Sequence, residues 1–189
     1  VVSLQRSISR RSKDFTSIDN LSVLETPLDK NDMVRKALRN ADLVIYCAGT
    51  VKGLNTQDFE QANVSCLRNI ATVALEVMKI PRIVLVSSLA ASQPHLSAYS
   101  DSKRRGENVL KEMSGLDWII LRPTAVYGVG DTELLPILKL IKLGLGISLG
   151  PVGQRLTFIH VDDCVKAIIA LSDNFDACKG SVFTCHDGK

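Results

Sequence analysis

The chain has 189 residues, of which 46% are hydrophobic, 23% are charged and only 5% are aromatic. This composition is typical of one soluble globular domain and excludes a disordered chain. The net charge of +3 is too small to indicate a nucleic-acid partner, and no apolar run approaches the roughly 20 residues that a bilayer span needs.

Five cysteines are scattered along the chain, with no CxxC pair and no histidine at a spacing that suits zinc. We therefore expect reduced thiols, no bound metal ion and a cytoplasmic location. We also expect a small-molecule substrate and neither a nucleic-acid nor a membrane partner, and we leave a homodimer open.

Short β-branched runs alternate with longer amphipathic segments, and this alternation predicts strands and helices in turn. Beginning with a strand, the expected elements cover residues 1–5, 31–40, 41–49, 56–80, 81–88, 97–113 and 116–123. A polar loop joins the first strand to the first helix. Strands separated by helices in this way are typical of a doubly wound parallel sheet, so the predicted class is a Rossmann-type α/β fold.

Three of these strands, at residues 43–47, 83–86 and 118–121, are apolar at every position, so helices should cover both of their faces. After Pro123 the chain is richer in glycine until Asp162, and a small C-terminal substrate lobe is expected from about 124 to 160. Asp162 is the expected N-cap of a final helix. The imidazole of His160 is expected to satisfy main-chain groups only.

The stretch "AYSDSKRRGE" places Tyr99 and Lys103 four residues apart, on one face of a predicted helix. A free tyrosine, with a pKa near 10, is a poor base at neutral pH. A neighbouring ammonium group lowers that pKa, so the pair predicts a general acid and base.

Two serines, Ser87 and Ser88, follow an apolar strand at its carboxyl end, where open α/β sheets bind ligands. A serine hydroxyl there can orient a substrate oxygen while the tyrosine transfers a proton. Each feature alone is weak, because a YxxxK pair and a double serine both occur by chance.

Four segments in order, "VLVSS", "YSDSK", "LRPTAVYG" and "FIHVDD", make the sequence similar to the extended short-chain dehydrogenase/reductase superfamily, the NAD(P)-dependent epimerase/dehydratase family. The resemblance implies that Tyr99 donates or accepts the proton, that Lys103 holds the nicotinamide ribose and that Ser88 orients the substrate. It further implies a set of cofactor-binding residues: Arg6, Cys47, Ala48, Gly49, Asn63, Ser87, Tyr99, Lys103 and Pro123. Arg155 resembles, with a one-residue offset, an arginine that binds diphosphate in nucleotide-sugar enzymes.

Two departures from the family affect the cofactor site. The Gly-rich turn that holds the pyrophosphate is not found in residues 1–189, and "VVSLQRS" resembles the second strand of the fold. We therefore expect an internal fragment, a domain that lacks its first strand and glycine loop. Pro27 also stands where the family has an acidic residue near the adenine.

The cofactor is expected to be NADP(H), with NAD as the alternative. Where NAD-preferring relatives carry an acidic residue, this chain has Gln5 and Arg6, and an arginine there can bind a 2′-phosphate.

The predicted function is an NAD(P)-dependent oxidoreductase that reduces a carbonyl or oxidises an alcohol. Two alternatives stay open: a nucleotide-sugar epimerase or dehydratase, and a non-catalytic NADP-binding sensor or assembly subunit.

Overall fold

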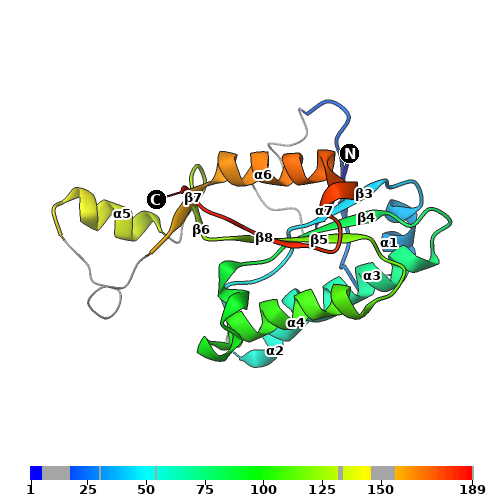
Figure 1. Cartoon of the computed structure of the whole chain (residues 1–189), viewed down its shortest axis with the longest axis horizontal. Coiled ribbons are helices and arrows are strands. Elements are labelled where there is room, and N and C mark those ends of the chain that lie inside the picture. Colours follow the sequence, from blue (N-terminus) through cyan, green and yellow to red (C-terminus); the bar gives the residue numbers. More distant parts are fainter. Residues whose placement is uncertain (6–17, 30, 54, 132–133, 146–155, 189) are drawn as a thin grey trace.

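The computed structural model describes residues 1–5, 18–29, 31–53, 55–131, 134–145 and 156–188. It is an α/β structure in which helices lie on both faces of a central parallel sheet (Figure 1). In chain order the elements are β1 (Val2–Gln5), β2 (Ser22–Glu25), α1 (Asn31–Leu38), β3 (Leu43–Tyr46), α2 (Thr56–Glu60), η2 (Gln61–Ser65), α3 (Cys66–Glu76), β4 (Arg82–Val86), η3 (Leu89–Ser92), η4 (Pro94–Leu96), α4 (Ala98–Glu112), β5 (Trp118–Pro123), β6 (Ala125–Tyr127), α5 (Leu135–Lys142), β7 (Phe158–His160), α6 (Val161–Asp173), α7 (Phe175–Cys178) and β8 (Val182–Cys185).

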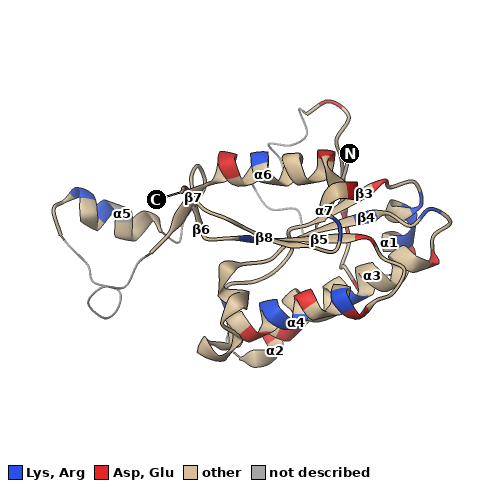
Figure 2. Cartoon of the chain, in the orientation of Figure 1, with Lys and Arg blue, Asp and Glu red and all other residues tan. Residues whose placement is uncertain are grey.

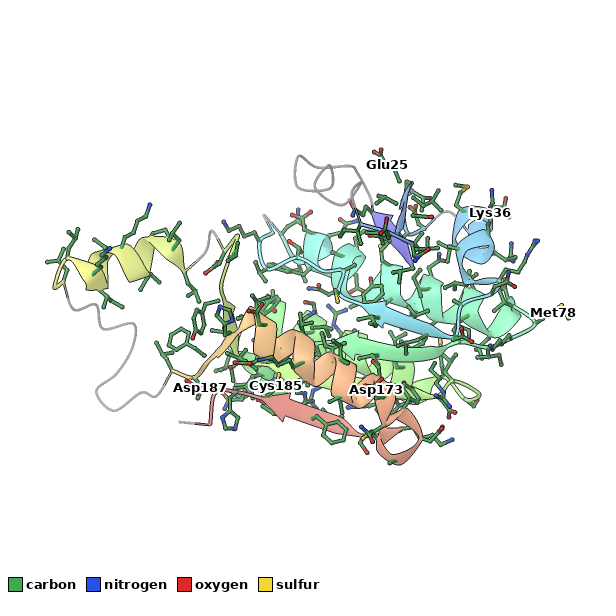
Figure 3. The ribbon with its side chains drawn as sticks, turned by 90° about the horizontal axis from the view of Figure 1, so that it is seen from above. Glu25, Lys36, Met78, Asp173, Cys185 and Asp187 are labelled. Carbon is green, nitrogen blue, oxygen red and sulfur yellow. The ribbon has the colours of Figure 1, made fainter. Side chains whose placement is uncertain are left out.

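The main sheet has the order β3-β4-β5-β8, and all of its pairings are parallel. β1 and β2 form a separate parallel pair, and within the described residues no ladder joins this pair to β3. Seen from above in Figure 3, Glu25 of β2 and Cys185 of β8 lie on opposite sides of the molecule. The doubly wound parallel α/β class predicted from the sequence is therefore confirmed.

The alternation of side chains along β4 explains why helices cover both faces. Ile83 and Leu85 point into a core built with α1, α3 and α4, whereas Val84 packs with Phe175 of α7 on the opposite face. Figure 1 shows this division, with α6 and α7 above the sheet and α2, α3 and α4 below it. Burial on both faces, expected for β4 and β5, is confirmed.

Two expectations about strands are wrong. Residues 22–25 form β2, although the segment was expected to be part of a polar loop. Its only apolar side chains, Val23 and Leu24, give no periodicity, so the pairing with β1 supplies what the local pattern lacks. In β3, Ile45 is 47% exposed, because this strand is the outer strand of the main sheet.

After Pro123, the short strands β6 and β7 pair in parallel, and α5 lies outside the main body (Figure 1). The charges of α5 are two lysines, Lys139 and Lys142 (Figure 2), and its Ile141 side chain is exposed. The helix α6 begins at Val161, so the expected cap at Asp162 is wrong. His160 takes that role, since its Nδ1 accepts the main-chain N–H of Asp162 at 3.3 Å. The expected bond from the His160 imidazole to a main-chain group is thus confirmed.

Among the helices that the structure describes, none has both the length and the apolar character that a bilayer crossing requires. The same part of the chain contains no group of three His, Cys, Asp or Glu side chains placed to hold a metal ion.

Candidate active site

The helix α4 carries Tyr99 in its first turn and Lys103 one turn later. Its start is fixed by Ser97, whose extended backbone and Oγ, an acceptor for the Ser100 N–H at 3.1 Å, are typical of an N-cap. The Tyr99 ring is partly buried and meets the ring of Phe59 edge-on, with 6.3 Å between centroids. The phenol ring therefore lies at the start of α4, in contact with Phe59 of α2.

Ser88 follows the carboxyl end of β4, and its Oγ accepts the N–H of Ala90 at 3.2 Å to start η3. Burial raises the pKa of Tyr99, and a hydrogen bond with the Ser88 side chain acts in the opposite direction. The structure thus brings Ser88 and Tyr99 into contact, as the sequence predicts.

Lys103 donates a hydrogen bond from Nζ to the carbonyl oxygen of Val86 at 3.2 Å, at the end of β4. Burial lowers the pKa of Lys103, while the Cys47 thiol and the Glu107 carboxylate act to raise it. The expected lowering of the Tyr99 pKa by Lys103 is not found: burial raises that pKa above its usual value, and the group that acts to lower it is Ser88 rather than Lys103.

Asn63 lies in the π-helical turn η2, a distortion frequent at functional sites. Its buried amide accepts the N–H of Thr50 at 3.1 Å and donates to the carbonyl of Thr50 at 3.2 Å. It also donates to Ser102 Oγ at 2.9 Å, and that hydroxyl donates to the carbonyl of Tyr99 at 2.8 Å. One side chain therefore ties the loop after β3 to the first turn of α4.

The predicted cofactor residues 47–49 and Pro123 lie at the carboxyl ends of β3 and β5, beside the end of β4. A Cβ atom on Gly49 would come within 2.6 Å of Asn63 Oδ1 and 3.5 Å of Lys103 Nζ, so only glycine fits. Beyond Pro123, Thr124 Oγ1 is buried without a hydrogen-bond partner among the described residues. The space at Gly49 beside the Lys103 ammonium, at the carboxyl ends of the strands, fits the nicotinamide end of a dinucleotide.

Ser87 is 7% exposed, and its hydroxyl donates to Glu107 Oε1 at 2.7 Å. Its N–H is bonded to the carbonyl of Leu121, so Ser87 has no hydrogen-bond donor left for a cofactor and could contact one only through oxygen acceptors. Arg6 and Arg155, the expected 2′-phosphate and diphosphate residues, lie outside the described residues.

A hollow of about 580 Å³ opens at the carboxyl end of β2, away from the Ser88–Tyr99 contact in sequence and sheet position. Its walls come from β2, the following turn and the start of α1: Glu25, Thr26, Pro27, Asn31, Asp32 and Met33. It contains Pro27, the residue that departs from the family pattern near the adenine.

Glu107, Ser102 and Thr50 belong to this site but were missed in the sequence. A signal for Glu107 was present, because it follows Lys103 by four residues and Tyr99 by eight, which places all three on one face of the helix.

Comparisons with known proteins identify the family of the chain. Residues 1–136 match the model of a family described as NAD(P)H-binding. The ceramide reductase of Caulobacter vibrioides is 34% identical over 132 residues, covering 70% of this chain and 41% of that protein. The mouse short-chain dehydrogenase/reductase family 42E member 1 is 31% identical over 158 residues, covering 68% of this chain and 40% of that protein.

Among solved structures, UDP-glucuronic acid 4-epimerase from Bacillus cereus, in complex with NAD, matches with a TM-score of 0.82 at 16% identity. The match covers 100% of this chain and 69% of that one, and it shows the fold alone. The chain belongs to the NAD(P)H-binding family and to the extended short-chain dehydrogenase/reductase superfamily. It spans about two fifths of the length of the curated relatives described above.

Proposed function

We propose that the protein is an oxidoreductase that reduces a carbonyl group or oxidises an alcohol, with Tyr99 as general acid and base. The observation that carries the proposal is that the Ser88 side chain lies close enough to the Tyr99 phenol to act on its pKa, while Lys103, one helical turn further along, bonds the Val86 carbonyl at the end of the same strand. The reductase and dehydrogenase names of the curated relatives support it. A nicotinamide cofactor follows from the family, and the preference for NADP(H) is part of the proposal.

We also propose the domain assignment made from the sequence. Residues 1–189 would be an NAD(P)-binding domain without its first strand and glycine loop, joined to part of a substrate lobe from about 124 to 160. The separation of the β1–β2 pair from β3 supports this assignment, since a strand between them would complete one continuous sheet.

The reduced cofactor supplies a hydride when it is bound. The chain supplies the orientation and the proton. Because the hydroxyls of Ser88 and Tyr99 lie together, both can donate hydrogen bonds to one substrate carbonyl oxygen. Tyr99 then releases its proton to that oxygen as negative charge develops there.

Burial raises the pKa of Tyr99, so the phenol of the free site is protonated at neutral pH and can act as an acid. The same hydroxyl has to lose its proton before it can act as the base in the oxidation of an alcohol.

The test is Tyr99→Phe in the full-length protein, assayed by NADPH absorbance with a panel of long-chain and cyclic ketones. Turnover should fall by about 10²-fold or more, because general acid catalysis contributes that much. The dissociation constant for NADPH should barely change. Tyr46→Phe is the matched control, since Tyr46 is a buried phenol that bonds only to the carbonyl of Ala62 in the hydrogen bonds described.

Unaltered turnover in Tyr99→Phe would refute the proton-transfer role. Conversion of a nucleotide sugar, with no ketone reduced, would establish the epimerase or dehydratase alternative. Binding of NADPH with no turnover of either substrate class would establish the non-catalytic alternative.

A further inference from the structure

A carboxylate is buried beneath the Ser88–Tyr99–Lys103 site. Glu107, on the inner face of α4, has no exposed surface and accepts hydrogen bonds from donors on three elements. Ser87 Oγ lies 2.7 Å from Oε1, and Arg122 of β5 binds in a fork, with Nε 2.7 Å from Oε1 and Nη2 2.6 Å from Oε2. Lys111 Nζ approaches Oε2 at 3.4 Å.

Burying such a pair is not needed for stability alone. Taking a carboxylate and a guanidinium out of water costs several kcal/mol, and well-packed apolar side chains of similar volume often stabilise a core as well or better. The surrounding core is in fact apolar, with Val109 and Leu110 next to Glu107 on the same helix. The ion pair instead orients β5 and α4 relative to each other, because a forked arginine–carboxylate contact fixes both the distance and the angle between the two side chains.

The two closest partners of Glu107 are immediate neighbours of site residues. Ser87 precedes Ser88, and Arg122 precedes Pro123. Glu107 itself lies one turn of α4 beyond Lys103. Glu107 with Ser87 and Arg122, here called the clamp, therefore joins the ends of β4 and β5 to α4. These three elements together carry the site.

We propose that Glu107 is a positioning residue for the reaction, which holds the β4 end that carries Ser88 against the helix that carries Tyr99 and Lys103. It touches neither substrate nor cofactor and acts through Ser87, Arg122 and the helix. This inference rests on the proposed function for its kinetic readouts.

The negative charge of Glu107 should also shift the pKa values of neighbouring groups, which the hydrogen bonds of the clamp alone would not do. The charged and titratable groups around Lys103 are the Cys47 thiol after β3 and the Glu107 carboxylate on α4, with the Val86 carbonyl of β4 as its hydrogen-bond partner. Around Glu107 they are Arg122 and Lys111. Replacing Glu107 by glutamine removes a negative charge and leaves Arg122 unpaired, and both changes lower the pKa of neighbouring acids.

The direction of the pH effect follows from this. In ketone reduction Tyr99 and Lys103 act in their protonated forms, so the rate falls on the alkaline side as either group loses its proton. Lower pKa values in Glu107→Gln move this alkaline fall in kcat to lower pH, by about one pH unit. The sign is the same whichever of the two groups dominates the titration.

The experiment compares three variants of the full-length protein in NADPH-dependent ketone reduction. Ser87→Ala removes one hydrogen bond of the clamp and no charge, so kcat should fall about tenfold with KM and the alkaline fall unchanged. Glu107→Gln should lower kcat and move the alkaline fall. Glu112→Gln is the matched control, because Glu112 is an exposed residue of the same helix, and it should behave as the unmutated protein.

A role confined to stability would lower the melting temperature of Ser87→Ala and Glu107→Gln but leave kcat and the pH profile of the folded enzyme unchanged, and that result would overturn the proposal. If Glu107→Gln does not fold, Arg122→Lys replaces it. This variant keeps the charge but loses the fork, so a reduced kcat with an unmoved alkaline fall supports the proposal, and full kcat refutes it.

If the unmutated protein reduces no ketone, the proposed function fails, and hydrogen exchange then tests the clamp by itself. In Ser87→Ala, faster exchange confined to residues 87–92 supports the positioning role, whereas exchange equal to that of Glu112→Gln refutes it.

Discussion

Gly106 lies where α4 crosses η2, and a methyl group there should disturb both packing and function. A Cβ atom at this position would lie 2.5 Å from the main-chain oxygen of Asn63, and relief to an ordinary contact requires a shift of about 0.9 Å. Overpacking of this kind costs about 1–3 kcal/mol, and because the obstacle is backbone we expect the upper part of that range. The better helix propensity of alanine returns about 1 kcal/mol. The net loss of unfolding free energy in Gly106→Ala should therefore be about 1–2 kcal/mol.

Urea unfolding of the full-length protein measures this loss, with Glu112→Ala as the control for helix propensity at an exposed site of α4. A displaced Asn63 should also loosen its contacts with Thr50 and Ser102, so NADPH should bind Gly106→Ala more weakly than the control. Equal or greater stability in Gly106→Ala, with unchanged NADPH affinity, would show that α4 and η2 can separate freely and that the close approach does not hold the site.

Two further predictions concern charge. The pKa of Glu107 is raised by burial but lowered more by Arg122 and Ser87, so it lies below its usual value and contributes stability that is full above about pH 4.5 and lost as the pH falls further. Unfolding free energies measured from pH 6 to pH 3, values chosen as roughly bracketing the glutamate range, should fall less steeply in Glu107→Gln, and parallel curves would contradict this. In the full-length protein NADPH should bind more tightly than NADH. Arg6→Ala should reduce the difference in binding free energy between the two cofactors by about 1.5–3 kcal/mol. Equal dissociation constants for the two cofactors in the unmutated protein would refute the role of Arg6.

The sequence was sufficient for the parts of the fold in which local pattern and tertiary packing agree. Runs such as Ile83–Val86 are apolar at every position, and the structure buries them between two layers of helices. It was insufficient for β2, because a four-residue strand with two apolar side chains forms only when β1 is beside it. The exposure of Ile45 likewise depends on sheet order, which strand composition does not encode.

The site shows the same limit at the level of side chains. Tyr99 and Lys103 do lie on one helix at the expected spacing, and the side chain of Ser88, after the strand end, lies beside that of Tyr99. The sign of the Tyr99 pKa shift could not be obtained in this way, because it depends on how much solvent each group loses. Sequence spacing predicts which side chains are neighbours, whereas their burial determines the direction in which their pKa values shift.

Two independent contacts fix α4, and their positions explain how a short motif can become a defined geometry. On one side the helix meets η2, where Gly106 allows the close approach and the Asn63 amide reaches the first turn through Ser102. On the other side Glu107 binds β4 and β5 through Ser87 and Arg122. The first contact holds the end of the helix that bears Tyr99, and the second holds the strand end that bears Ser88. The Ser88 and Tyr99 side chains lie between these two contacts, so a displacement at either contact should change the distance between their hydroxyls.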